Sequence, residues 1–263
     1  MTLKYLLPAL ALTVATAASA EDYQLFTSLN AEHVRVSGDS ETNFGLNGQY
    51  FFDKKHTLGP LDQFEYINKV SNVSAAFASV YDNNTWQIGG EYFAENKFVV
   101  MANYQNFDNF DVKSIGLGYL ISDDFIVRAQ AIKPEDSDTA YAFSASYNHQ
   151  LQGSDYIGFS AFTDDEFDYY GVSSKYFASL NNGRYIAVGV LLADDDGSSD
   201  WSANADYYFS QRTSIGASYN KADAYRLTAK HFFNQSWAVE AGFASNTDSS
   251  ELKTYSLALT GQF

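Results

Sequence analysis

The residues best suited to chemistry are seven charged side chains that stand inside otherwise apolar segments of the chain. They are the cations Arg128, Lys175, Arg226 and Lys230, and the carboxylates Glu91, Asp206 and Glu240. Isolated charges of both signs can attract or repel a charged solute, or pair with one another on neighbouring strands. They do not form a recognisable catalytic set, because acid–base catalysis needs an acid and a base that act on the same atom.

Other reactive residues give no stronger indication of catalysis. His33, His56, His149 and His231 lie in unrelated segments, and none stands near a serine in a recognisable nucleophile motif. The sequence has no glycine-rich phosphate loop and no metal-ligand spacing. We therefore expect no enzyme activity, no cofactor and no metal centre, although a hydrolase built from separate strands stays a third hypothesis.

One acidic run could bind hard cations. "DDDGSSD" contains Asp194, Asp195 and Asp196, whose carboxylate oxygens suit divalent cations. The run lacks the acidic residue at the far end of an EF-hand loop, so we favour a solvated loop. Clustered carboxylates of this kind could also bridge through divalent cations to surface lipopolysaccharide.

Composition narrows the classes of partner and fold. The net charge of −16 argues against a nucleic-acid partner, which would need clustered Lys and Arg. Cysteine is absent, so stability must come from a core or from closure of a sheet. The apolar content is spread over 20 Tyr and 21 Phe, and no internal run is long enough for a membrane-spanning helix.

The N-terminus is typical of an export signal. Lys4 precedes an apolar stretch from Tyr5 to about Val14, and small residues follow up to Ala20. A membrane anchor is the weaker alternative, because the apolar stretch is shorter than the ~20 residues that a spanning helix needs. We expect residues 1–20 to be a signal peptide and residues 21–263 to be a single domain.

The positioning elements are strands. Alternating apolar and polar residues, bounded by turn residues, predict sixteen of them. They lie near 24–36, 42–52, 72–81, 85–93, 98–107, 112–121, 125–133, 139–149, 156–163, 168–179, 184–193, 200–209, 213–220, 224–233, 237–245 and 254–263. The count falls to fourteen if two weak strands, such as the first and the ninth, merge with their neighbours.

The regular spacing of these strands predicts an all-β, up-and-down antiparallel barrel that spans a membrane. A tilted strand of ~10 residues crosses the hydrocarbon layer, where only a closed barrel satisfies the backbone. The last segment, "KTYSLALTGQF", is expected to pair with the first strand near residues 23–36 and close the barrel. Its Tyr255, Leu257 and Leu259 should then face lipid.

The connections fall into two alternating sets. Nineteen of the 32 acidic residues lie in one set. The other set follows strand ends rich in aromatic residues, as membrane-interface girdles do. We assign the acidic loops to the cell exterior and the aromatic-flanked turns to the periplasm. A soluble meander would have no reason to separate charge in this way.

The connection after Tyr50-Phe51-Phe52 is the longest of the aromatic-flanked set. It contains Leu61, Phe64, Ile67 and Val70 at a spacing compatible with a short amphipathic helix. A packed periplasmic turn is the favoured interpretation. The alternative is a segment, within residues 53–70, that leans into the mouth of the barrel.

This region carries a resemblance to a known family. Gly59-Pro60-Leu61, then Tyr66-Ile67-Asn68-Lys69 and Ser71-Asn72-Val73, resembles the first-turn signature of the family described as putative general bacterial porins. The pattern departs from the family between Asp62 and Glu65. The resemblance implies a barrel of the Gram-negative outer membrane for passive diffusion of small hydrophilic solutes, and it implies trimers.

Two further expectations follow from the resemblance. A route to the outer membrane through the periplasm is implied, with outer-membrane lipid and lipopolysaccharide as surroundings. The terminal Phe263, with Leu259, Leu257 and Tyr255, resembles the signal that the barrel assembly machinery recognises.

In such a barrel the small and polar faces of the strands line a lumen. Residues such as Asn43, Gly45, Asn47 and Gln49 cannot build a dry core, so water should fill it. All seven charged residues named first should then line a pore with a mixed, slightly basic wall and an acidic exterior mouth.

Turn counting places the wall charges beside particular neighbours. Arg128 should stand beside Gly118 and Ser144. Lys175 should stand beside Gly158 and Gly189, and these small neighbours would leave both cations free to reach into the pore. Lys230 should pair with Glu240 across strands.

The leading hypothesis is a porin that conducts ions and small solutes by passive diffusion. The alternative is a structural or surface-interaction barrel whose acidic loops bind cations or envelope partners. It predicts a lumen blocked by side chains or by residues 53–70.

Overall fold

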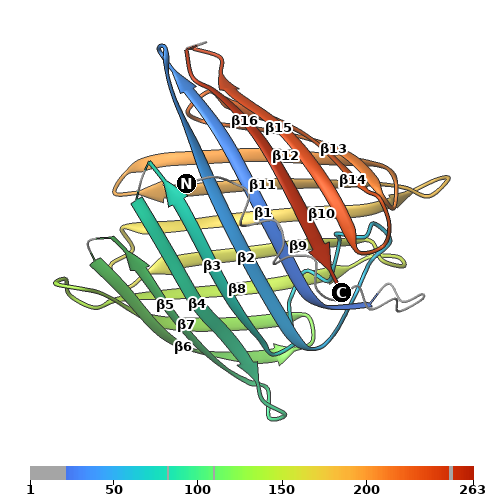
Figure 1. The fold of residues 1–263 in the computed structure, drawn as a ribbon. Coiled ribbons are helices and arrows are strands. Elements are labelled where there is room, and N and C mark those ends of the chain that lie inside the picture. The colour runs from blue at the N-terminus through green and yellow to red at the C-terminus, as the bar shows by residue number, and fades with distance from the viewer. Residues whose placement is uncertain (1–21, 82, 109, 249–250) are drawn as a thin grey trace.

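A computed structural model describes residues 22–81, 83–108, 110–248 and 251–263, which form one closed antiparallel sheet (Figure 1). Its strands are β1 (Asp22–Val36), β2 (Asp39–His56), β3 (Asn72–Val80), β4 (Asn83–Phe93), β5 (Phe98–Phe107), β6 (Phe110–Ser122), β7 (Phe125–Pro134), β8 (Ala140–Gln150), β9 (Tyr156–Asp164), β10 (Tyr169–Leu180), β11 (Arg184–Asp195), β12 (Ser198–Ser210), β13 (Thr213–Asn220), β14 (Ala224–Phe232), β15 (Trp237–Asn246) and β16 (Lys253–Gln262). The sixteen-strand prediction is confirmed. The fourteen-strand alternative is wrong, because β1 and β9 are separate strands.

Each strand pairs with its neighbours in sequence, and β16 pairs with β1 to close the barrel, as Figure 1 shows. In this seam Leu29 lies opposite Leu259 and Ala31 opposite Leu257, which confirms the predicted closing strand. Closure removes the two open edges, whose unpaired backbone groups a bilayer cannot hydrate.

The alternation of the sequence puts apolar side chains on the outside. On β6, Ile115 and Leu117 are 69% and 60% exposed, whereas Gly118 between the outward positions is buried. Large apolar residues that are exposed in this way recur on fourteen of the sixteen strands. The exceptions are β7, where outward Val127 is half-buried, and β15, where outward Trp237 and Phe243 are half-buried. An exposed apolar belt of this extent is the surface that lipid covers. Among the described residues, no helix is long and apolar enough to cross a membrane.

The two ends of the barrel differ. We call the end where β1 starts and β16 finishes the terminal end, and the opposite end the acidic end. Tight turns close several hairpins at the acidic end: Ser37 and Gly38 link β1 to β2 with φ values of 49° and 102°. Two successive positive φ values give the hairpin twist that suits neighbouring strands.

The predicted export signal, residues 1–20, lies outside the described residues. The second strand is longer than predicted, because Lys55 and His56 continue it by pairing with Tyr23 and Asp22. A register shift in β1 between Tyr23 and Leu25 accommodates this extension.

Candidate functional site

The lumen is the concave, polar part of the molecule and the candidate site. Inward positions on β2 are Asn43, Gly45, Asn47 and Gln49, opposite to the face that carries exposed Phe44 and Leu46. Neighbouring inward residues hydrogen-bond along the wall, for example Asn47 Nδ2 to Ser28 Oγ at 2.6 Å. Such a lining needs water, since it offers more polar atoms than the wall satisfies by itself.

Residues 57–71, which we call the crossing segment, enter this lumen at the terminal end. The Leu61 N–H donates to the Gln211 carbonyl at 2.9 Å, and the Leu61 carbonyl accepts from Gln262 Nε2 at 3.0 Å. Gln63 Nε2 donates to Tyr208 Oη at 2.6 Å. The segment therefore contacts the wall at β12, at the β12–β13 turn and at β16, far from the β2 and β3 strands that it connects.

Its far end reaches the opposite part of the wall. Tyr66 Oη lies 2.8 Å from Ser160 Oγ of β9, and the Tyr66 ring lies 5.8 Å from the Tyr156 ring. The favoured prediction of a packed periplasmic turn is wrong, and the alternative of a segment that leans into the mouth of the barrel describes the structure.

The helix suggested by the spacing of Leu61, Phe64, Ile67 and Val70 does not form. Residues 57–71 contain no helix, only a tight turn in which the Gln63 N–H donates to the Pro60 carbonyl at 3.1 Å. The apolar residues point to different parts of the wall. Leu61 packs with Phe232 and Ala238, whereas Ile67 packs with Val99, Met101 and Ile126. Phe64 contacts Phe26, with ring centroids 5.3 Å apart. A helix would place these residues on one face, so burial against several walls selects an irregular path instead.

Two glycines make room for this segment. A Cβ at Gly158 would lie 2.4 Å from the Tyr66 ring. Gly59 has a φ of 129°, which L-residues rarely adopt, and a Cβ there would lie 2.5 Å from the Tyr185 ring. The space at Gly158 therefore serves Tyr66, and not Lys175 as predicted.

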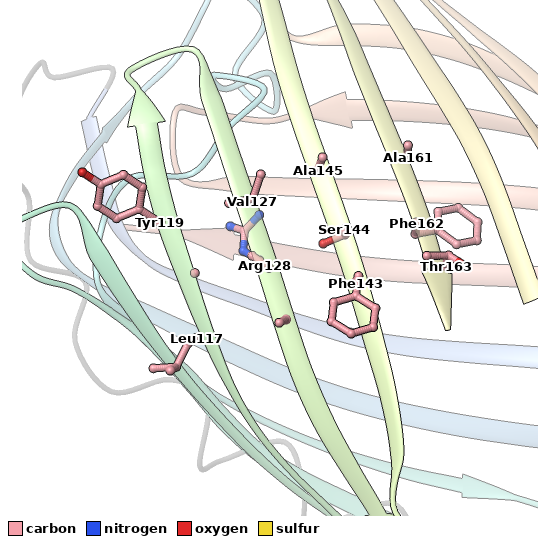
Figure 2. A pocket seen from close by; sticks show the side chains of 12 residues that line it. Leu117, Tyr119, Val127, Arg128, Phe143, Ser144, Ala145, Ala161, Phe162 and Thr163 are labelled. Carbon is pink, nitrogen blue, oxygen red and sulfur yellow. The ribbon is translucent and has the colours of Figure 1, made fainter. Parts of the chain in front are cut away.

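The register of Arg128 is as predicted, with Gly118 on β6 and Ser144 on β8 as its neighbours. Figure 2 shows Arg128 and Ser144 on the neighbouring strands β7 and β8. The cation is not free, however. Its Nε lies 3.4 Å from Glu91 Oε1 on β4, so these two residues, both predicted to line the wall, form an ion pair. The pair spans β5 and β6, which lie between β4 and β7.

Lys175 likewise has the predicted neighbours, Gly158 and Gly189. Its Nζ donates to Gln63 Oε1 of the crossing segment at 2.8 Å and lies 5.9 Å from the centroid of the Tyr156 ring. The prediction of a lysine free to reach into the pore is wrong. Its contact was not predictable from strand pairing, because the partner comes from a segment without regular structure.

Lys230 stands across from Glu240 as predicted, with Nζ 3.2 Å from Glu240 Oε2. It also lies 3.0 Å from Asp62 Oδ2, which links the wall to the crossing segment. Arg226 Nη2 lies 2.7 Å from Glu32 Oε1. Asp206 lies on the inner face of β12, opposite Ala187 and Gly216.

Sequence reasoning missed several charged lumen residues. Glu32 lies opposite Ser256 on the inner face of β1, so the alternation of β1 could have revealed it. Lys55 and Glu65 could not be found in that way. Lys55 is 5% exposed, and its Nζ lies 2.9 Å from Glu65 Oε1 and 3.0 Å from Asn68 Oδ1.

A hollow of about 390 Å³ remains between the crossing segment and the wall formed by β1, β2 and β4. Its lining combines aromatic and polar side chains, namely Phe26, Gln49, Phe51, Lys55, Phe64, Asn68 and Glu91. Lys55 and Glu91 present opposite charges to it. This space lies beside the crossing segment at the terminal end and is not filled by it.

The remaining chemistry of the chain is dispersed. In the part of the chain that the structure describes, no three His, Asp or Glu residues form a group that could hold a metal ion. His56 Nδ1 contacts Asp22 Oδ1 at 2.5 Å at the terminal end, and His231 Nδ1 lies 2.9 Å from Thr213 Oγ1. His33 contacts Thr42 and Arg35 near the acidic end, and the His149 ring lies 6.4 Å from the Tyr147 ring.

The terminal residue belongs to the barrel seam. The Phe263 carbonyl accepts from the Gln24 and Leu25 N–H groups at 2.6 and 2.8 Å, and the Phe263 N–H donates to the Leu25 carbonyl at 2.8 Å. Its ring packs against the Trp237 ring, with the centroids 5.3 Å apart. Tyr255, Leu257 and Leu259 are exposed on the outer face.

Comparisons with known proteins agree with this architecture. A family model described as "Putative general bacterial porin" matches residues 2–263. The outer membrane protein Omp33 of Acinetobacter baumannii has a similar fold, with a TM-score of 0.63 and 17% identity over 93% of this chain and 100% of that chain. A triple mutant of the Rhodopseudomonas blastica porin gives a TM-score of 0.55 and 10% identity, over 91% of this chain and 99% of that chain. No curated protein sequence matches the chain significantly.

Proposed function

Because the chain belongs to the family described as putative general bacterial porins, we propose that it forms a narrow channel for passive diffusion of small hydrophilic solutes and ions. Family membership places the barrel in the bacterial outer membrane and identifies it as a non-enzymatic protein. The predicted resemblance and location are therefore confirmed, and the hydrolase hypothesis is wrong.

The observation that carries the channel proposal is a polar lumen that keeps unfilled space beside the crossing segment. The hollow next to Lys55 and Glu91 is lined by charged and amide side chains that can replace part of the hydration of a solute. Phe26, Phe51 and Phe64 narrow the same space with apolar rings. Passage would then be limited to solutes of small cross-section.

Charge on the wall is largely balanced, which supports weak ion selectivity. Arg128, Arg226 and Lys230 each lie within 4 Å of a carboxylate. The acidic end would then dominate the field at the mouth and raise the local cation concentration at low ionic strength. This differs from the slightly basic wall that the sequence suggested.

The orientation that we infer puts the acidic end outside the cell and the terminal end in the periplasm. The crossing segment would then narrow the periplasmic side of the channel. The proposal includes removal of residues 1–20 as a signal peptide during export, and a trimer in the membrane. It also includes recognition of Phe263, Leu259, Leu257 and Tyr255 by the barrel assembly machinery.

Planar-bilayer recording tests the channel. The purified full-length mature chain should give stepwise conductance increments whose size is small for a sixteen-stranded barrel. A matched variant in which a short Gly-Ser linker replaces residues 57–70 should give larger steps. If both proteins insert but neither conducts, the diffusion channel is excluded.

The second candidate is a structural or surface-interaction barrel that binds cations or envelope partners through its acidic loops. The contacts of the crossing segment support this second candidate, because they fill part of the lumen at the terminal end. It predicts that the native chain inserts silently while the linker variant conducts. That pattern would identify a barrel kept closed by residues 57–71.

A further inference from the structure

The hollow of about 390 Å³ beside the crossing segment combines two unlike charges with an apolar wall. The charged residues of its lining are Lys55 of β2 and Glu91 of β4, and three phenylalanine rings line the same space. Its volume lies within the range of about 300–1,000 Å³ that is usual for small-molecule sites. Such sites pair an apolar lining with a few polar groups that orient the ligand, and this hollow has both.

The Lys55 ammonium group keeps donor capacity in this hollow. The residue is almost fully buried, and an ammonium group carries three N–H donors. Two of them are used, by Glu65 Oε1 at 2.9 Å and by Asn68 Oδ1 at 3.0 Å. Among the described residues no third oxygen or nitrogen accepts from Lys55, whose Nζ lies 5.4 Å from the centroid of the Phe51 ring. A carboxylate that enters the hollow would accept from the third donor.

The Glu91 carboxylate is loosely held for a side chain that is only 25% exposed. Oε1 lies 3.4 Å from Arg128 Nε, and Oε2 accepts from Asn68 Nδ2 at 3.4 Å. Charge-assisted bonds to carboxylates usually measure about 2.7–2.9 Å, and a carboxylate has about four acceptor positions. Within the described part of the chain, Glu91 therefore keeps acceptor capacity for an ammonium group.

One amide group spans the gap between these two charges. Asn68 Oδ1 accepts from Lys55, and Asn68 Nδ2 donates to Glu91. Asn68 Nδ2 also donates to the Val70 carbonyl at 2.9 Å, and Asn68 Oδ1 accepts from the Val70 N–H at 3.2 Å, so the amide is held in one orientation. The ammonium and carboxylate groups of an α-amino acid are separated by a single carbon atom. With a hydrogen bond at each end, such a molecule spans a gap of this size.

The apolar side of the hollow is a cluster of three rings. Phe26 of β1 lies edge to face with Phe51 of β2 and with Phe64 of the crossing segment, with ring centroids 5.5 and 5.3 Å apart. These contacts hold Phe64 against the wall, yet all three rings also line the unfilled space. An apolar side chain of a solute would be removed from water there, which favours its binding.

The charge balance around the hollow favours a ligand with no net charge. Lys55 already has Glu65 as a counter-ion, and Glu91 already has Arg128. A purely anionic ligand at Lys55 would also meet the charge of Glu65, and a purely cationic ligand at Glu91 would also meet Arg128. A zwitterion offers the opposite charge to each residue and leaves the sum unchanged, so no unpaired charge is buried.

We propose that this hollow is a binding subsite for a free α-amino acid with an apolar or aromatic side chain. The carboxylate binds at Lys55, the ammonium group binds at Glu91, and the side chain packs against the three rings. The assignment deepens the proposed channel function and rests on it for the route by which the solute arrives. Binding itself requires no net passage through the barrel.

Binding of L-phenylalanine to the detergent-purified full-length mature protein tests the subsite. Saturation-transfer NMR measures the affinity, with the signal from empty micelles subtracted. Three analogues each lack one feature: glycine lacks the apolar side chain, 3-phenylpropionate the ammonium group, and phenethylamine the carboxylate. Each should bind at least about 10-fold more weakly, because each loses one charged hydrogen bond or the buried ring.

Two results with the native protein would overturn the proposal. One is the absence of saturable L-phenylalanine binding up to about 10 mM, a concentration at which even a weak site is detectable. The other is binding of 3-phenylpropionate or phenethylamine as tight as that of L-phenylalanine, which would show a site for a single charge.

The substitution Glu91→Gln removes the negative charge and keeps the shape of the side chain. It should weaken L-phenylalanine binding by about 10-fold and should not weaken binding of 3-phenylpropionate, which has no ammonium group. Equal losses for both ligands would indicate a structural role of Glu91 and contradict the assignment. The matched control is Glu32→Gln, which removes a lumen carboxylate that lies 2.7 Å from Arg226 and should leave both affinities unchanged.

The substitution Lys55→Gln should weaken L-phenylalanine binding and not that of phenethylamine, which has no carboxylate. Lys55 also contacts Glu65 and Asn68, so circular dichroism checks that this variant folds. If it does not fold, the Glu91→Gln measurements and the analogue series in the native protein decide, and each of them can contradict the proposal.

Bilayer recordings are separate from these measurements. Silent bilayers together with L-phenylalanine binding of the expected specificity would contradict the channel and support the subsite. Conducting bilayers without L-phenylalanine binding would support the channel and contradict the subsite.

Discussion

At the scale of single residues, small side chains in the lumen serve the crossing segment. Gly158 is the clearest case, since the position of its missing Cβ lies against the Tyr66 ring. The charges follow the same pattern. Lys175 and Lys230 contact Gln63 and Asp62 of the crossing segment, so the wall cations hold that segment in place as well as lining the lumen.

The substitution Gly158→Ala should loosen the crossing segment. The added methyl group would lie 2.4 Å from the Tyr66 ring, which must move and lose its hydrogen bond to Ser160. Overpacking of this kind costs about 1–3 kcal/mol. We expect a lower thermal unfolding temperature together with a larger unitary conductance.

A matched control is Gly45→Ala, because the nearest atom to a Cβ at Gly45 is 3.8 Å away. It should change neither the unfolding temperature nor the conductance. Equal effects of the two substitutions would show that the space at Gly158 is not needed by Tyr66.

Charge reversal at Arg128 and Lys175 should shift ion preference toward cations. Arg128→Glu replaces an ion pair with two neighbouring carboxylates, because Glu91 stays in place. Lys175→Glu removes the donor to Gln63 and adds a negative charge to the wall. Reversal potentials in a salt gradient measure the shift, which high salt should screen.

Neutral substitutions at the same positions separate charge from packing. Arg128→Gln and Lys175→Gln should shift the reversal potential by about half as much. Unchanged reversal potentials in the Glu variants would show that neither Arg128 nor Lys175 contributes to ion selectivity.

At the scale of elements, the crossing segment is a connection that enters the lumen and contacts distant strands of the wall. The other connections at the terminal end are short, such as the link between Ser210 of β12 and Thr213 of β13. The crossing segment is anchored at β9, β12 and β16 by side-chain and backbone hydrogen bonds. Its irregular path lets each apolar residue reach a separate cluster in the wall.

Replacement of residues 57–70 by a short Gly-Ser linker should raise conductance several-fold without opening the sheet. No ladder between strands involves these residues, and Phe51 and Asn72 already lie opposite each other where β2 and β3 meet. The unitary conductance and the size of the largest permeant sugar should both increase.

Shortening the turn at residues 151–155, between β8 and β9, provides the comparison. That turn bonds locally, as in the Leu151 N–H to the Asp155 carbonyl at 2.8 Å, and should not affect the lumen. Equal conductance in the linker variant and the native chain would show that solutes do not pass through the terminal end.

At the scale of the whole molecule, closure between β1 and β16 makes the barrel compatible with a lipid bilayer, because it pairs the backbone groups of both edge strands. The seam extends from Arg35 opposite Lys253 to Phe26 opposite Gln262, and the backbone of Phe263 continues it. The terminal aromatic residue thus has two separable properties. Its backbone closes the sheet, and its ring is a separate feature of a residue that is 37% exposed.

The substitution Phe263→Ala should lower the amount of folded protein in the outer membrane of cells. It keeps the three backbone hydrogen bonds to Gln24 and Leu25 and removes only the ring. If the assembly machinery recognises the ring, refolding of the purified variant into detergent should be nearly normal while assembly in cells is impaired. In both settings, the amount of folded barrel is measured as the fraction of protein that stays folded in SDS before heating.

Phe263→Tyr keeps an aromatic ring and should restore assembly in cells. Normal cellular amounts of the Phe263→Ala protein would contradict the proposed signal. Equal losses in cells and in detergent would instead assign the ring a packing role against Trp237.

The sequence by itself determined the barrel, because alternation with period two is a local property that each strand carries in its own residues. It therefore predicted sixteen strands, the β1–β16 seam and the neighbours of Arg128, Lys175 and Lys230. Only the tertiary structure decided what fills the lumen. Residues 57–71 contact strands that are distant in sequence and have no regular period, so the partners of Lys55, Lys175 and Tyr66 depend on how the whole wall surrounds them.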